Sequence, residues 1–166
     1  MAFSYPIRNA RLFFHNWSGS PDRYNKKGQM PNIAVIIPEE DVGYFKDDLG
    51  FDVKTKALDD GGYFYFLKVK VGKYADVYVR DADSMMHKVS ADPEMNELGT
   101  LDGMRFNKID MSIVARDWDN GDKKGRSAYL KEFFGEEAPH SDMYREWINP
   151  DPTSRLYFST GLGNDD

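Results

Sequence analysis

The sequence predicts a folded, mainly β domain, and two observations carry that prediction. Apolar residues recur at every second position through most of the 166 residues, which is the period of a strand with one buried face. Apolar residues make up 40% of the chain and aromatic residues 14%, so the chain can bury enough surface to fold. We expect one domain over residues 1–135, with one or two short helices, and an irregular acidic extension over residues 136–166.

The first half of the chain begins with a strand, a long loop and a central strand. Residues 7–17 predict a strand whose core face holds Ala10, Leu12 and Phe14. The outer face of that strand then holds Arg11, Phe13, His15 and Trp17. Residues 18–32, rich in Gly, Pro, Asn and Lys, predict a loop, and residues 33–37, apolar on both faces, predict a buried strand.

A short helix and a half-buried strand follow. Pro38 precedes three acidic residues that suit the positive end of a helix dipole, and Gly50 suits its end, so residues 38–50 predict a short helix. Alternation over residues 51–57 then predicts a strand. Its inward positions are Phe51, Val53, Thr55 and Ala57.

Residues 63–71 and 75–80 are expected to form a hairpin around Gly72, Lys73 and Tyr74. Pairing Val71 with Ala75 places the apolar residues of both strands on one core face, whereas a shift by one residue would bury lysines. The opposite face then combines cations with aromatic rings. Its members are Phe64, Phe66, Lys68, Lys70, Tyr78 and Arg80.

The second half predicts one more short helix and a final hairpin. Asp92 before Pro93 suits the N-cap of a helix within residues 92–104. Residues 109–115 alternate with an inward face, residues 119–125 suit a turn, and residues 127–134 pair back. The periodicity fades after Gly135.

The sequence gives little sign of catalysis. The chain has no cysteine, which excludes thiolate catalysis, disulfides and cysteine zinc sites. His15, His87 and His140 have no acidic partner at metal-ligand spacing. We therefore expect no enzymatic activity, no cofactor and no metal. Because no apolar run approaches the ~20 residues of a membrane helix and residues 1–10 do not resemble a signal peptide, we expect a cytoplasmic protein with no membrane contact.

The charge is unevenly distributed along the chain. The net charge of −6 opposes indiscriminate binding of a polyanion. Residues 1–31, however, hold five basic residues and one acidic residue, whereas residues 126–166 hold eight acidic and four basic residues. The molecule should therefore have a basic and an acidic side.

Outward aromatic rings and cations on two separate β elements favour binding of a single nucleic-acid strand, because bases stack on rings while Lys and Arg follow the phosphates. Two loops add further cations. The candidate residues on the first strand and the long loop are Arg11, Phe13, Trp17, Arg23, Tyr24, Lys26 and Lys27. Those on the hairpins are Phe64, Phe66, Lys68, Lys70, Tyr78, Arg80, Lys123, Lys124 and Arg126. In the OB-fold, a small Greek-key barrel, two such loops flank the ligand strand.

Three stretches carry a resemblance to a known family. They are residues 7–19 (IRNARLFFHNWSG), residues 24–28 (YNKKG) and residues 32–37 (NIAVII). With residues 67–71, 77–79 and 128–131, they resemble the bacteriophage OB-fold single-stranded-DNA-binding proteins over residues 7–134. The resemblance implies an OB-fold-like Greek-key barrel. It also implies largely sequence-independent binding of single-stranded DNA in phage DNA replication or recombination, in the host cytoplasm.

Two alternatives stay open. The same aromatic surface suits a β-barrel protein-interaction module, whose binding would respond little to salt. We expect the extension to recruit replication or recombination proteins or to shield the DNA site. Alternatively, Leu156, Tyr157 and Phe158 pack on the barrel or on a second subunit of a homo-oligomer.

Overall fold

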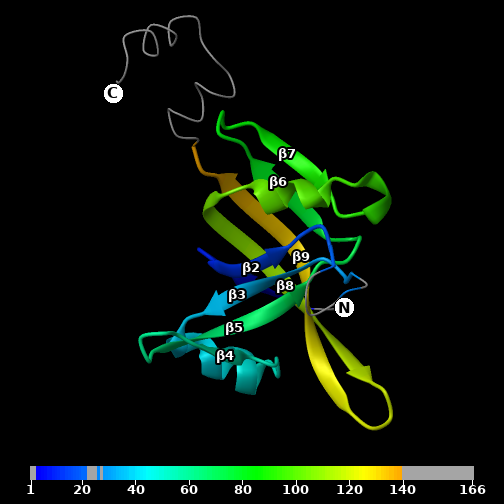
Figure 1. Cartoon of the computed structure of the whole chain (residues 1–166). Helices are drawn as coiled ribbons and strands as arrows, with labels where there is room; N and C mark the ends of the chain where they lie inside the picture. Colours follow the sequence, from blue (N-terminus) through cyan, green and yellow to red (C-terminus); the bar gives the residue numbers. More distant parts are fainter. Residues whose placement is uncertain (1–2, 22–25, 27, 140–166) are drawn as a thin grey trace, which may run out of the picture.

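The structure is a computed structural model that describes residues 3–21, 26 and 28–139. In that part of the chain, nine strands form one sheet in the order β1-β8-β9-β5-β3-β2, with β4 on β5, β6 on β9 and β7 on β6 (Figure 1). The strands are β1 Ser4–Ile7, β2 Leu12–Asn16, β3 Asn32–Ile37, β4 Lys54–Ala57, β5 Tyr63–Lys70, β6 Asp76–Arg80, β7 Met86–Ser90, β8 Phe106–Asp119 and β9 Lys124–Glu137. The predicted mainly β, OB-fold-like architecture is confirmed.

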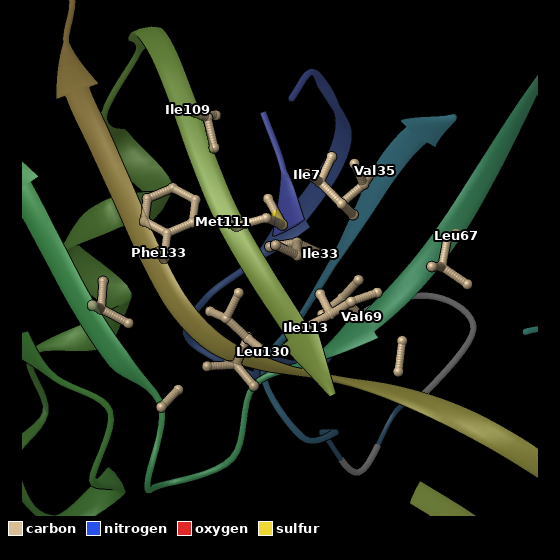
Figure 2. Packing of buried hydrophobic residues seen from close by; sticks show 14 of the residues in the cluster. Ile7, Ile33, Val35, Leu67, Val69, Ile109, Met111, Ile113, Leu130 and Phe133 are labelled. Carbon is tan, nitrogen blue, oxygen red and sulfur yellow. The ribbon is translucent and has the colours of Figure 1, made fainter. Parts of the chain in front are cut away.

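The core lies inside the curved sheet (Figure 2). β3 supplies Ile33 and Val35, which are both fully buried because they share the face of the strand that is turned to the core. β5 supplies alternate residues such as Leu67 and Val69, and β9 supplies Phe133. Of the inward positions predicted for residues 109–115, Ile109, Met111 and Ile113 are buried, and Ala115 is partly buried against the core. A period of two is set by the strand backbone itself, so the sequence predicts it well.

The two ends of the sheet, β1 and β2, are consecutive in the chain. The first predicted strand is thus two strands, separated at Asn9, whose φ is +51°. Between them, the Ala10 amide donates to the Ile109 carbonyl at 2.7 Å, and the Arg11 carbonyl accepts from the Ile36 amide at 2.8 Å. Residues 8–11 therefore join the β8 edge to the β3 edge, and in the described residues the sheet is not closed by a strand ladder.

A β-bulge corrects the predicted faces of β2. The register with β3 shifts between Leu12 and Phe14, so that Phe13 is an extra residue. One extra residue reverses the alternation that follows it. Phe14, predicted in the core, is therefore 39% exposed, and Trp17, predicted outward as a DNA-binding residue, is 1% exposed. Trp17 packs edge-on against Phe133, with ring centroids 4.9 Å apart, so it is a core residue.

The predicted hairpin between residues 63–71 and 75–80 is wrong. β5 pairs antiparallel with β3 and β4, whereas β6 pairs antiparallel with β7. Both β5 and β6 run parallel to β9, β5 at its beginning and β6 further along. The predicted buried face is nevertheless correct, with Val71 and Val77 buried. Burial depends only on alternation within a strand, but pairing depends on which distant strand completes the sheet.

The remaining segments follow the predictions with changes of detail. The first helical segment contains a 3₁₀ turn at Glu39–Asp41 and a π turn at Tyr44–Asp48. The second consists of the 3₁₀ turns Pro93–Met95 and Leu98–Gly103, and the Asp92 side chain caps the first by accepting from the Glu94 amide. Thr55 and Ala57 are exposed, contrary to prediction, because β4 is an edge strand. The predicted final hairpin is confirmed, and β9 continues through Glu137, two residues past the predicted end of the domain at residue 135.

Candidate nucleic-acid interface

Three predicted rings form a cluster on the outer face of the sheet. Phe13 lies edge-on to Phe64 and to Phe66, with ring centroids 5.1 and 4.9 Å away. Phe13 comes from the β2 bulge, while Phe64 and Phe66 alternate with inward residues of β5. Edge-on packing leaves ring faces uncovered by one another. We call these three residues the phenylalanine cluster.

Cations surround this cluster on the same face of the sheet. Residues directly opposite on neighbouring strands point to the same side. Lys54 is opposite Phe66, and Lys56 is opposite Phe64. Ala34 of β3 pairs with Phe14 of β2 on one side and with Lys68 of β5 on the other. The outer face of β2, β3, β5 and β4 therefore interleaves rings with lysines, the mixture that single-stranded nucleic acid requires.

A groove of about 360 Å³ continues from this face toward the β8–β9 hairpin. The free end of that hairpin projects beyond the rest of the sheet (Figure 1). Its Trp118 lines the groove, and its ring lies over Gly125, where a Cβ would come within 2.6 Å of the ring. The groove brings together five cations, Lys54, Lys68, Lys70, Lys124 and Arg126, and one carboxylate, Asp52. We call this the cationic groove.

Arg126 fixes the hairpin to the rest of the domain rather than standing free. Its guanidinium donates to Asp117 at 2.6 and 3.2 Å and to the Leu49 carbonyl at 2.7 Å. The hydrogen bond from Arg126 lowers the pKa of Asp117 and raises the pKa of Arg126. Among the described residues, Lys68, Lys70 and Lys124 have no carboxylate within ion-pair distance, and Lys54 has only Asp52 at 4.0 Å. These four lysines are therefore the cations that are available to an anionic ligand.

Two predicted site residues lie in another region. Tyr78 and Arg80 belong to β6, which is beside the far half of β9 and not beside Phe66. The Tyr78 ring stacks on Phe134 with an interplanar angle of 6°. Arg80 lies 3.8 Å from Glu136. The cross-strand contacts predicted between these residues and β5 are wrong, because the hairpin that would bring them together does not form.

The other predicted residues are distributed as follows. Arg11, Lys26 and Lys123 are exposed, on the β1–β2 connection, the long loop and the hairpin turn. The predictions for Arg23, Tyr24 and Lys27 lie outside the described residues. Sequence reasoning missed Phe14, Lys54 and Trp118. Alternation did place Lys54 outward, but only the β4–β5 ladder shows which surface it joins.

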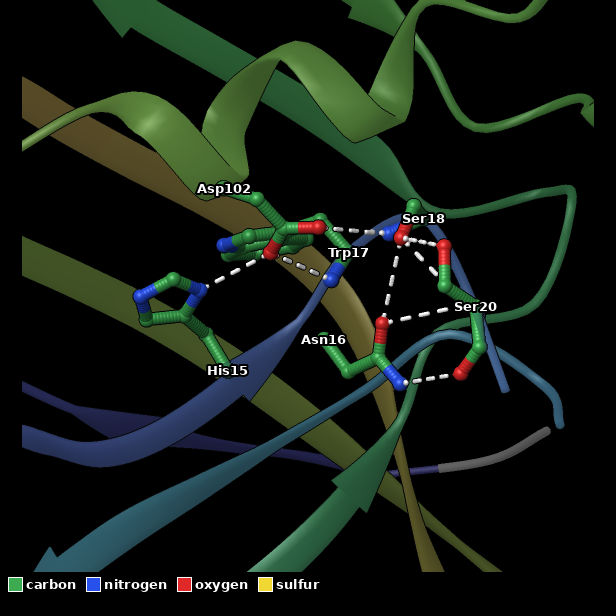
Figure 3. A network of polar contacts seen from close by, with 6 residues as sticks. All are labelled: His15, Asn16, Trp17, Ser18, Ser20 and Asp102. Atoms are coloured by element: carbon green, nitrogen blue, oxygen red, sulfur yellow. Dashed lines mark hydrogen bonds and ion pairs between the residues drawn. The ribbon is translucent and has the colours of Figure 1, made fainter. Parts of the chain in front are cut away.

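A polar network holds the start of the long loop (Figure 3). The Asp102 carboxylate accepts from the Trp17 amide at 2.8 Å and the Ser18 amide at 3.0 Å, and it contacts His15 Nδ1 at 2.8 Å. Partial burial opposes the charged form, but the hydrogen bonds from His15, Trp17 and Ser18 outweigh it and lower the pKa of Asp102. His15 therefore has a structural partner, and the network fixes the direction in which the loop leaves β2.

The described part of the chain contains neither a candidate metal site nor a helix suited to cross a membrane. No group of three or more His, Cys, Asp or Glu side chains there is arranged to hold a metal ion. No helix among the same residues has the length and apolar character needed to cross a membrane.

Comparisons with known proteins identify the family and a similar fold. Residues 4–137 match the family model described as "Putative phage ssDNA-binding domain". No curated protein sequence matches the chain. The fold is similar to a C-terminally truncated single-stranded DNA-binding protein from bacteriophage Enc34, with a TM-score of 0.50, 10% identity, and coverage of 82% of this chain and 87% of that one.

Two further solved structures are more distant. The bacteriophage Enc34 protein in complex with ssDNA gives a TM-score of 0.44 at 13% identity, over 84% of this chain and 89% of that one. The single-stranded DNA-binding protein gp2.5 of bacteriophage T7 gives 0.40 at 10% identity, over 99% and 100% of the two chains.

Proposed function

The chain belongs to the phage ssDNA-binding domain family, and from that premise we propose that it binds single-stranded DNA with little sequence preference during phage DNA replication or recombination. The observation that carries the proposal is the phenylalanine cluster beside the cationic groove. Stacking is available to every base because each base has a π face, and phosphates are common to all sequences. The arrangement therefore suits a strand of any sequence.

The groove accounts for binding despite the acidic net charge of −6. Among the described residues, Lys68, Lys70 and Lys124 have no carboxylate within ion-pair distance and Lys54 has only Asp52 at 4.0 Å, so the local field of the groove is positive although the net charge of the chain is negative. We propose that the protein acts by binding alone, as a non-enzymatic protein without a cofactor, in the cytoplasm of the host cell.

The test is a titration with single-stranded DNA, duplex DNA and single-stranded RNA at several salt concentrations. We expect single-stranded DNA to bind tighter than duplex, at about 4 to 16 nucleotides per domain. If the four available lysines each meet a phosphate, log affinity should fall against log salt with a slope of roughly −3. A flat salt response would instead favour a protein-interaction module that uses the same rings. Equal or tighter duplex binding would also contradict the proposal.

We further propose that residues 136–166 are an acidic extension that recruits replication or recombination proteins or shields the DNA site, the alternative being packing within a homo-oligomer. Because β9 includes Glu136 and Glu137, a truncation should follow Pro139. The truncated protein should fold and bind single-stranded DNA with equal or higher affinity, measured by thermal melting and titration. Loss of folding would show that the extension completes the core.

A further inference from the structure

A second pocket that also combines cations with aromatic rings lies further along β8 and β9 from the groove. It has a volume of about 560 Å³ and is lined by residues 72–75 together with parts of β8 and β9. Its cations are Lys73, Arg116 and Lys131, and its rings are Tyr74 and Tyr129. No carboxylate is among the described residues that line it. We call this the Tyr74 pocket.

The exposure of Tyr74 is unexplained by the fold. Its side chain is 82% exposed, so it contributes little to the core, and its only described ring contact is with Lys73, whose Nζ lies 5.2 Å from the ring centroid. A large ring that is this exposed, on a surface without a nearby carboxylate, is available to stack with a ligand. The cations beside Tyr74 favour an anionic ligand.

A shallow depression connects the cationic groove with the Tyr74 pocket. Lys70 and Trp118 line both the groove and the depression, while Arg116 and Tyr129 line both the depression and the pocket. The Tyr129 ring has Arg116 Cζ at 4.6 Å and Lys70 Nζ at 5.7 Å from its centroid. The carboxylate that lines the depression, Asp117, is neutralised by Arg126. An unbroken path of rings and cations therefore joins the two sites.

We propose that the Tyr74 pocket is a second subsite for the DNA strand, filled only when the strand is longer than the phenylalanine cluster and the groove can hold. This inference rests on the proposed function. A strand that leaves the groove at Lys70 crosses Tyr129 and stacks a base on Tyr74, with its phosphates near Lys73, Arg116 and Lys131. The route follows β8 and β9 away from the groove, and it lengthens the site without adding sequence preference.

The test compares Tyr74→Ala with the parent over oligothymidylates from about four to about twenty nucleotides. In the parent, affinity should rise with length in two stages, as first the groove and then the pocket fills. Tyr74→Ala should remove the second stage and weaken binding of the longest strand by about 5- to 150-fold, the loss expected for one stacked base. The shortest oligothymidylate that binds the parent should bind Tyr74→Ala with the same affinity.

Two matched variants complete the design. Tyr74→Phe keeps the ring and should restore the parent affinity at every length. Tyr44→Ala removes a tyrosine that is also largely exposed, at 49%, but lies among acidic residues of the first helical segment, and it should change nothing. Lys73→Gln with Lys131→Gln should reduce the salt slope by about 1.4 for the longest strand only.

The outcomes separate the two proposals. If the parent binds no single-stranded DNA of any length, the proposed function itself is wrong. If the parent binds and Tyr74→Ala matches it at all lengths, the second subsite is wrong and the proposed function stands. Equal weakening at all lengths would also overturn the inference, because Tyr74 would then belong to the site that fills first.

Discussion

The phenylalanine cluster with its groove and the surface of β6 and β7 both carry aromatic rings with cations, and of these two regions only the first is available to a ligand. In the phenylalanine cluster the rings meet edge-on, and in the neighbouring groove Lys68 and Lys70 have no ion-pair partner among the described residues. On β6 and β7 the pattern looks similar, but Tyr78 is stacked flat on Phe134 and Lys88 is 3.4 Å from Asp76.

The difference shows what makes such a surface a binding site. On β6 and β7, Arg80 is paired with Glu136 and Lys88 with Asp76, so both of these cations have a neighbouring carboxylate, and His87 contacts Asp81. The hydrogen bond from His87 lowers the pKa of Asp81, so this carboxylate stays charged to a lower pH than an ordinary aspartate does. A phosphate would have to displace these acids, whereas in the groove it meets cations directly. Residue type alone does not distinguish the two regions, but counter-charges and ring stacking do.

The largest effect is expected from reversing charge in the groove. Lys68→Glu with Lys70→Glu should weaken binding of single-stranded DNA at about 0.1 M salt by at least roughly 25-fold, because two phosphate contacts are lost and two repulsions replace them. The matched variant, Arg80→Glu with Lys88→Glu, changes charge equally on β6 and β7 and should lose far less affinity. Similar losses in both would abolish the distinction between the regions.

Removing one ring from each region should give the next largest effect. Phe66→Ala should cost about 1 to 3 kcal/mol of binding free energy with the salt slope unchanged, because stacking does not release counterions. Tyr78→Ala should leave binding unaltered, since its ring already stacks on Phe134. Titration at two salt concentrations measures both. Unaltered affinity in Phe66→Ala together with a large loss of stability would make the phenylalanine cluster purely structural.

The smallest effect on DNA is expected from a residue outside both regions. Asp102→Ala removes the acceptor of the Trp17 and Ser18 amides and should cost about 1 to 2 kcal/mol of stability, with little change in DNA affinity. Thermal melting and titration separate these quantities. A loss of affinity without loss of stability would place the loop that leaves β2 within the DNA site.

Asp102 also has a defined pH signature. Its pKa is lowered in the folded protein, so its contribution to stability is present above its unfolded pKa of about 3.9 and is lost as the pH falls through the lower folded value. As the pH falls through this range, Asp102→Ala should therefore lose less unfolding free energy than the parent. An equal loss of unfolding free energy in the variant and the parent would show that folding does not favour the charged form of Asp102.

The sequence by itself determined which side chains are buried wherever a strand is regular. Leu67, Val69, Val77 and Val79 are buried as alternation predicts, and Lys68 is exposed beside them. Successive side chains of a strand point to opposite faces whatever the strand pairs with, so the buried set can be read without knowing its neighbours. The same argument placed Phe64 and Phe66 outward, and they lie in the candidate interface.

Only the tertiary structure decided which outward residues share a surface. β5 and β6 are separated by five residues, yet both pair in parallel with β9, whose position is fixed by strands far along the chain. This separates Tyr78 from Phe66 and brings Trp118 and Lys124 to the groove instead. The bulge at Phe13 likewise turns Trp17 into the core, where its ring packs edge-on against Phe133 of β9. Strand pairing and bulges are set by the free energy of the whole sheet, which local alternation does not record.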